Sequence, residues 1–118
     1  MYVSRFHSWE QSVGPLLDAA GLADRLAKRQ TVLIKPNLVE IKQPPITTPV
    51  DLIAALADGL RERVPGIRLI VGEGNGATDY DTWQTFRALG YSSLAAGQDL
   101  ELMDLNTEPL VELSRPEC

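Results

Sequence analysis

Apolar residues recur at helical spacing in the first part of the chain, which predicts an amphipathic helix. The apolar stripe consists of Val13, Leu16, Leu17 and Ala20. Because a proline clashes with the carbonyl four residues earlier in a helix interior, we expect the helix to start near Ser12, with Pro15 in its first turn. Gly21 is expected to end it, and residues 22–28 predict a second, short helix.

Two compact apolar runs flank the clearest helical pattern of the chain. Residues 31–34 (TVLI) and 67–71 (IRLIV) are rich in β-branched residues and predict strands, the first one covered on both faces. Between them, Pro49 suits the first position of a helix that Thr48 is expected to cap. A strand, a helix and a strand in this order predict a right-handed parallel crossover.

The last third of the chain predicts four further elements after a glycine-rich loop. These are a helix over 81–89, one more helical turn over 92–97, a strand over 100–105, and a short fourth strand over 110–113 that forms a hairpin with the third. We therefore expect an open three-layer α/β fold in one domain over 1–118. Its sheet is expected to be small and mainly parallel, with about four strands and a C-terminal β-hairpin.

Composition narrows the function classes. The chain of 118 residues is 44% hydrophobic and 23% charged, which is typical of a folded globular protein. Its 11 basic and 16 acidic residues give a formal net charge of −5, which argues against broad binding to nucleic-acid backbones. We see no apolar stretch long enough for a membrane span, and no secretory signal. The single cysteine excludes a cysteine-ligated cluster within this chain, and a cytoplasmic location is expected.

The candidate site follows from the strand order. Ligands of open α/β sheets bind beyond the carboxyl ends of the strands, where strand-to-helix loops and helix N-termini meet. The first two strands deliver candidate catalytic and ligand-binding residues to that edge, and the third is expected to add Asp104. The catalytic candidates are Lys35 and Glu73, and the ligand-binding candidates are Asn37, Thr47, Thr48, Gly72, Gly74, Asn75 and Gly76.

Lys35 has two interpretations. Directly after a buried strand, its ammonium could bind a carboxylate or phosphate, or act as a base if its pKa is low. Alternatively, Lys35 is a surface lysine paired with Glu73 or Glu40. The G-E-G-N-G loop over 72–76 likewise either brings backbone amides close to an anion or forms a tight turn without a ligand. It is neither a Walker loop nor a GxGxxG motif.

Other chemistry-bearing residues favour structural roles, and no metal site is predicted. Asp79 and Asp81 suit the first turn of a helix, where the dipole favours carboxylates. The single histidine, His7, supports neither a zinc triad nor a catalytic pair. Cys118 is terminal and is expected to be an exposed thiol.

Several segments resemble, in order, the family known as domain of unknown function 362. They are VLIKPNLV over 32–39, Thr47-Thr48-Pro49, IVGEG over 70–74, Thr82-Trp83 with Phe86, and Gly90-Tyr91. The resemblance implies an α/β domain that occurs in proteins with ferredoxin-type iron–sulfur modules, but no established reaction. Members usually continue into a second half with a lysine–threonine–histidine motif, so the chain is expected to be the N-terminal portion of a longer family domain.

Two functions remain open. The chain could be the part of a redox-associated enzyme that binds a small anionic molecule, with Lys35 and Asn37 as contacts and Glu73 as acid–base group or metal ligand. It could instead be a non-catalytic module whose open sheet docks on a partner, since unpaired strand edges are normally covered. The expected partners are a C-terminal half, an iron–sulfur protein or a second copy of the chain. No cofactor is assigned.

Overall fold

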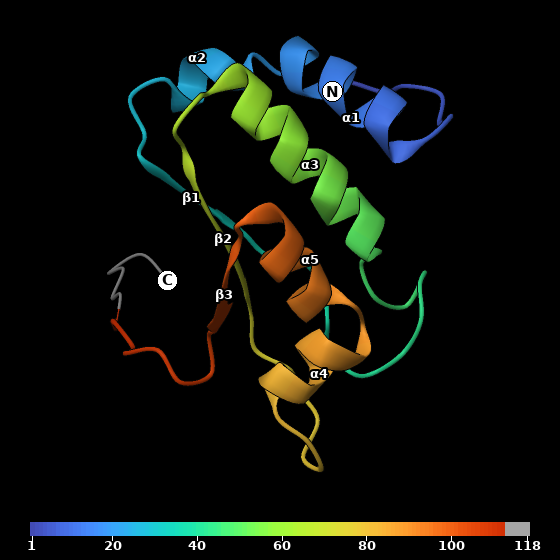
Figure 1. Ribbon diagram of the computed structural model, residues 1–118, viewed down its shortest axis with the longest axis vertical. Coiled ribbons are helices and arrows are strands. Elements are labelled where there is room, and N and C mark those ends of the chain that lie inside the picture. The colour runs from blue at the N-terminus through green and yellow to red at the C-terminus, as the bar shows by residue number, and fades with distance from the viewer. Residues whose placement is uncertain (113–118) are drawn as a thin grey trace, which may run out of the picture.

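The computed structural model describes residues 1–112, in which five helices and three strands form an α/β fold (Figure 1). The elements are α1 (Trp9–Ala19), α2 (Leu22–Leu26), β1 (Thr31–Ile34), α3 (Val50–Arg63), β2 (Arg68–Glu73), α4 (Thr82–Ala88), α5 (Tyr91–Gln98) and β3 (Glu101–Asp104). Within this part of the chain, no helix has the length and apolar character needed to cross a membrane.

The sheet has the order β1-β2-β3, and both strand pairs are parallel. Leu33 lies in register with Ile70, and Glu73 lies in register with Asp104. The predicted parallel crossover is therefore confirmed. The expected C-terminal hairpin is wrong for the described residues, because after β3 the chain turns at Thr107 and residues 110–112 form no strand. Leu113, the last residue of the expected fourth strand, lies outside the described residues.

The helices gather on one face of the sheet. Because both crossovers advance in the same direction along the sheet, their helices fall on the same side, where α3 packs between α1 and α5 (Figure 1). This face carries the hydrophobic core, with Val71 and Phe86 fully buried. On the opposite face Leu33 is 50% exposed. In the described residues the fold thus has two layers, and the expectations of three layers and of a doubly covered first strand are wrong.

Two helix starts differ from the predictions. Ser8 caps α1 by accepting a hydrogen bond from the amide of Gln11, so the helix begins at Trp9 and contains Pro15 in its interior. Pro49 is the residue that precedes α3, and it provides no side-chain cap. The hydroxyl of Thr48, the expected cap, instead accepts a hydrogen bond from the amide of Asn37. Pattern alone could not foresee this competing donor from another segment.

The start of α4 agrees with the prediction, and α5 is longer than expected. Asp81 accepts a hydrogen bond from the amide of Gln84, whose side chain accepts one from the amide of Asp81, a capping box. Gly90, at φ 85°, separates α4 from α5. This left-handed conformation is available to glycine at little cost, and it lets the chain begin a second helix at once.

Candidate functional site

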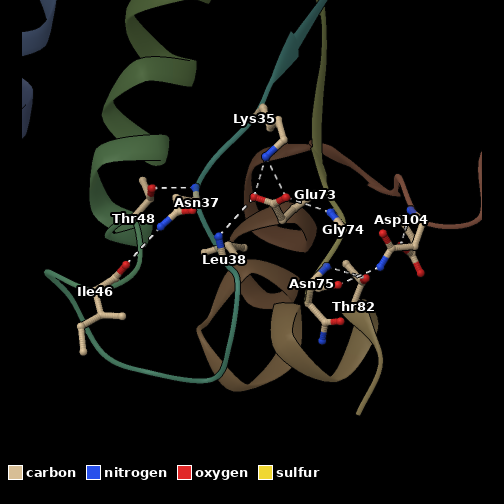
Figure 2. Close-up of polar contacts among 11 residues, drawn as sticks. Lys35, Asn37, Leu38, Ile46, Thr48, Glu73, Gly74, Asn75, Thr82 and Asp104 are labelled. Carbon is tan, nitrogen blue, oxygen red and sulfur yellow. Dashed lines mark hydrogen bonds and ion pairs between the residues drawn. The ribbon is translucent and has the colours of Figure 1, made fainter. Parts of the chain in front are cut away.

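Lys35 and Glu73 meet at the carboxyl edge of the sheet, as the sequence predicts. Lys35 directly follows β1 and Glu73 ends the neighbouring strand β2. The Lys35 ammonium lies 2.8 Å from Oε1 and 3.0 Å from Oε2 of Glu73 (Figure 2). Of the two partners considered for Lys35, the structure selects Glu73. Glu40 pairs with Lys42 instead, at 2.9 Å.

The two charged groups of this pair have different surroundings. The Glu73 side chain is 5% exposed, whereas that of Lys35 is 58% exposed. The Glu73 carboxylate also accepts hydrogen bonds from the amide of Leu38 (3.2 Å) and from its neighbour Gly74 (2.9 Å). A buried carboxylate is tolerated when charge and hydrogen bonds compensate it in this way. Glu73 therefore fixes the position of an ammonium that solvent can still reach.

The loop between β1 and α3 is held by its own polar groups. Asn37 and Thr48 exchange hydrogen bonds, from the Asn37 amide to the Thr48 hydroxyl (2.9 Å) and from the Thr48 amide to the Asn37 carbonyl (3.0 Å). The side-chain nitrogen of Asn37 donates to the carbonyl of Ile46, and the hydroxyl of Thr47 donates to that of Lys42. These three candidate ligand-binding residues thus stabilise the loop. They also line a mainly apolar hollow of about 400 Å³ beside Trp9.

The amides of residues 74–76 in the glycine loop are used within the protein. Gly74 donates to Glu73, Asn75 to the hydroxyl of Thr82 (3.2 Å), and Gly76 to the carbonyl of Val39 (3.1 Å). The loop glycines 72, 74 and 76 do not have positive φ angles, unlike Gly21, Gly66 and Gly90. Gly72 and Glu73 belong to β2, and residues 74–77 leave the strand without a turn, so the tight-turn interpretation is not confirmed. The amides of residues 74–76 offer an anion no cradle of free donors.

Close packing explains two of the loop glycines. A Cβ atom at Gly74 would collide with the side chain of Asn106, and one at Gly72 would approach Leu33 to 2.8 Å and Leu105 to 3.1 Å. At Gly76 the nearest atom would lie at an ordinary 3.8 Å. Glycine at positions 72 and 74 therefore leaves room for neighbouring side chains, which would have to shift to admit a Cβ atom.

A buried polar cluster lies beside the lysine–glutamate pair. Asn75, 8% exposed, donates its side-chain amide to Thr85 Oγ1 (2.9 Å) and to the carbonyl of Tyr80 (3.0 Å). Asp104, 6% exposed, accepts a hydrogen bond from the amide of Asn106 (3.0 Å) and is the register partner of Glu73. The third strand thus delivers a second carboxylate to the edge, as expected.

Comparison with known proteins places the chain in a family. The model of the family described as "Domain of unknown function (DUF362)" matches residues 32–118. The chain belongs to the DUF362 family. No curated protein and no solved structure matches it. The matched segment of this DUF362 chain contains the lysine–glutamate pair and the described sheet except Thr31, the first residue of β1, whereas α1 and α2 precede it.

Two residues at the carboxyl edge of the sheet are absent from the candidates that the sequence suggested. Asn106 donates its side-chain amide to the carbonyl of Asn75 (3.0 Å), joining the turn after β3 to the glycine loop. Tyr91 is fully buried and donates its hydroxyl to the carbonyl of Thr48 (2.8 Å). Burial, helped by the negative charge of Glu73, raises the pKa of Tyr91, which keeps this donor protonated. The sequence indicates Tyr91 only by its place in the resemblance, and Asn106 falls between the two strands of the expected hairpin.

The other residues considered in the sequence either make structural contacts or lie outside the described residues. Asp81 caps α4. The carboxylate of Asp79 accepts a hydrogen bond from the hydroxyl of its neighbour Thr78. The backbone amide of His7 donates to Ser12. Within residues 1–112, no three histidine, cysteine, aspartate or glutamate side chains are grouped to hold a metal ion. Cys118 lies outside the described residues.

Proposed function

We propose that this DUF362 chain binds a small anionic molecule at the carboxyl edge of its sheet, with Lys35 as the contact. One observation carries the proposal: the Lys35 ammonium is held by a buried carboxylate, and the Lys35 side chain is nevertheless 58% exposed. An ammonium fixed in this way loses little further side-chain freedom when it binds a ligand, which favours affinity. Its place also agrees with the general position of ligands in open α/β folds.

In this proposal Glu73 is a positioning residue. Its carboxylate already accepts hydrogen bonds from the ammonium of Lys35 and from two backbone amides, which supports a role in holding Lys35 in place. The roles of Glu73 as an acid–base group and of Lys35 as a base stay predictions. So do a cytoplasmic location, an iron–sulfur partner and a place within a longer family domain.

The test is an NMR titration of ¹⁵N-labelled protein with two probes, propionate and inorganic phosphate, at constant ionic strength. We expect at least one probe to shift the amide signals around Lys35 and Glu73 in a saturable way. Lys35→Met should abolish these shifts. Lys42→Met is the matched control, because Lys42 is also paired with a glutamate and is 54% exposed. Saturable shifts that persist in Lys35→Met, or no shifts with either probe, would refute the proposal.

Lys35→Met leaves the buried carboxylate of Glu73 without its cation, so this variant could unfold. The double variant Lys35→Met/Glu73→Gln removes both charges and keeps one oxygen, which can accept the hydrogen bond from the amide of either Leu38 or Gly74. Its folding is checked by circular dichroism before the titration. If it is folded and still binds the probe, Lys35 is not the contact.

A second candidate function is docking of a partner on the open face of the sheet. The observation that favours it is Leu33, which is half exposed and lies with Leu105 over Gly72. Parallel sheets are normally covered on both faces, so an exposed apolar residue at this place suits a protein layer. Light scattering tests a second copy as that layer: we expect a concentration-dependent dimer that Leu33→Lys disrupts. A monomer at all concentrations would contradict self-association.

A further inference from the structure

The hydrogen-bond donors at the carboxyl edge limit the class of anion that can bind there. Phosphate sites at strand-to-helix loops use several converging backbone amides. Here the amides of Gly74, Asn75 and Gly76 donate within the protein, over 2.9, 3.2 and 3.1 Å. The side chain of Asn106 fills the space beside Gly74 through which a phosphate would approach the backbone.

The charges at this edge also disfavour a phosphate. The single positive charge of Lys35 is matched by the negative charge of Glu73 at 2.8 Å. Asp104 adds a second buried carboxylate on the neighbouring strand, in register with Glu73. An approaching anion therefore meets one ammonium and two carboxylates. A phosphate monoester carries about −1.5 to −2 charges at neutral pH and is repelled more strongly than a carboxylate with one charge.

From these two observations we infer that the ligand of this edge is a monocarboxylate and not a phosphate or phosphate ester. A carboxylate needs only one or two donors, and an ammonium on a side chain that is 58% exposed can provide one. The inference rests on the proposed function, since it names the chemical class of the anion that Lys35 contacts.

A titration with propionate and inorganic phosphate at pH 7.5 tests the preference for a monocarboxylate separately from the proposed binding of an anion by Lys35. We expect propionate to shift the amides around Lys35 with a Kd on the order of millimolar. Inorganic phosphate should bind there at least about tenfold more weakly, because it lacks converging amides and meets two carboxylates. Sodium chloride at the same ionic strength should not reproduce the shifts.

The outcomes are distinct. If phosphate shifts the same amides with equal or greater affinity, and Lys35→Met abolishes the effect, the inference is wrong and the proposed function stands. If neither anion binds, or if chloride produces the same shifts, both are wrong. If propionate binds but Lys42→Met abolishes the effect and Lys35→Met does not, both are wrong again.

A second variant tests the electrostatic reason itself. Asp104→Asn keeps an oxygen that can accept the hydrogen bond from the amide of Asn106 but removes the negative charge. We expect it to strengthen phosphate binding about threefold more than it strengthens propionate binding, because phosphate carries the additional charge. Equal effects on the two anions would show that Asp104 does not contribute to the discrimination.

Discussion

Two ion pairs of this protein are nearly identical in length and differ in their surroundings. The ammonium of Lys35 lies 2.8 Å from Glu73, and that of Lys42 lies 2.9 Å from Glu40. Both lysine side chains are more than half exposed, at 58% and 54%. The carboxylates differ, because the Glu73 side chain is 5% exposed and that of Glu40 is 39% exposed.

The difference teaches where an ion pair contributes to the fold. The Glu40–Lys42 pair joins residues two positions apart within one loop, so it constrains little chain. The Lys35–Glu73 pair joins two strands, and its carboxylate also accepts the amides of Leu38 and Gly74. Exposed pairs contribute little to stability. When the partner of a buried charge is removed, the desolvation penalty of that charge is no longer compensated.

The largest predicted effect comes from removing the cation that pairs with the buried Glu73 carboxylate. Lys35→Met leaves the Glu73 carboxylate buried without a counter-charge, and we expect the free energy of unfolding to fall by about 3 kcal/mol. Urea denaturation followed by circular dichroism measures it. The control, Lys42→Met, should leave the stability unchanged within error, because both groups of that pair are solvated. Equal losses in the two variants would remove the distinction between the pairs.

A smaller effect is expected in the glycine loop beside Glu73. A Cβ atom at Gly74 would collide with Asn106 and displace its hydrogen bond to the carbonyl of Asn75. We therefore expect Gly74→Ala to lower the free energy of unfolding by about 1–3 kcal/mol. Thermal and urea denaturation of the purified variant measure the loss.

The matched control lies two residues further along the same loop. At Gly76 a Cβ atom has only ordinary contacts and φ is not positive, so Gly76→Ala should be neutral or stabilising by up to about 1 kcal/mol. The double variant Gly74→Ala/Asn106→Ala removes the colliding side chain and should cost less than the sum of the two single substitutions. A neutral Gly74→Ala would show that the Asn106 side chain moves aside freely.

The sequence predicted those features that depend on local pattern. The contiguous apolar runs identified β1 and β2, and the crossover rule then placed Lys35 and Glu73 at one edge. The sequence could not decide between Glu40 and Glu73 as the partner of Lys35. Without the register of the sheet, either carboxylate could lie within reach of a flexible lysine. The fold makes the choice by burying one of the two carboxylates.

The failed predictions involve contacts between segments that are distant in sequence. The hydroxyl of Thr48 accepts a hydrogen bond from the amide of Asn37 and does not cap α3. The side chain of Asn106, which donates to the carbonyl of Asn75 31 residues away, occupies the space beside Gly74, a glycine that suggested anion binding. Local spacing contains no information on such pairs. The expected fourth strand failed for a related reason: residues 110–112 alternate weakly and find no neighbouring strand within the described residues, where Leu110 is 95% exposed.

The smallest predicted effect concerns a third pair, in which the carboxylate is the exposed partner: the Asp18 side chain is 63% exposed and that of Arg63 is 18% exposed. Asp18 accepts hydrogen bonds from Nε (2.6 Å) and Nη2 (2.8 Å) of Arg63, joining α1 to α3. The hydrogen bond from the guanidinium lowers the pKa of Asp18 below its ordinary value of 3.8. Because the folded-state pKa is depressed, the stabilisation is fully present above about pH 4 and is lost as the pH falls through the lowered value.

Asp18→Asn cannot titrate, so the stability difference between the wild-type protein and this variant isolates the pair. We expect the difference to be small and constant from pH 7 down to about 4, and to vanish at lower pH as Asp18 becomes protonated. Urea denaturation at a series of pH values and at low and high salt measures it. High salt should shrink the difference, because the Asp18 side chain is 63% exposed. A difference that grows on acidification would contradict the sign of the pKa shift. One as large as that of Lys35→Met would show that removing the partner of the largely buried Arg63 guanidinium costs as much as removing the partner of the buried Glu73 carboxylate.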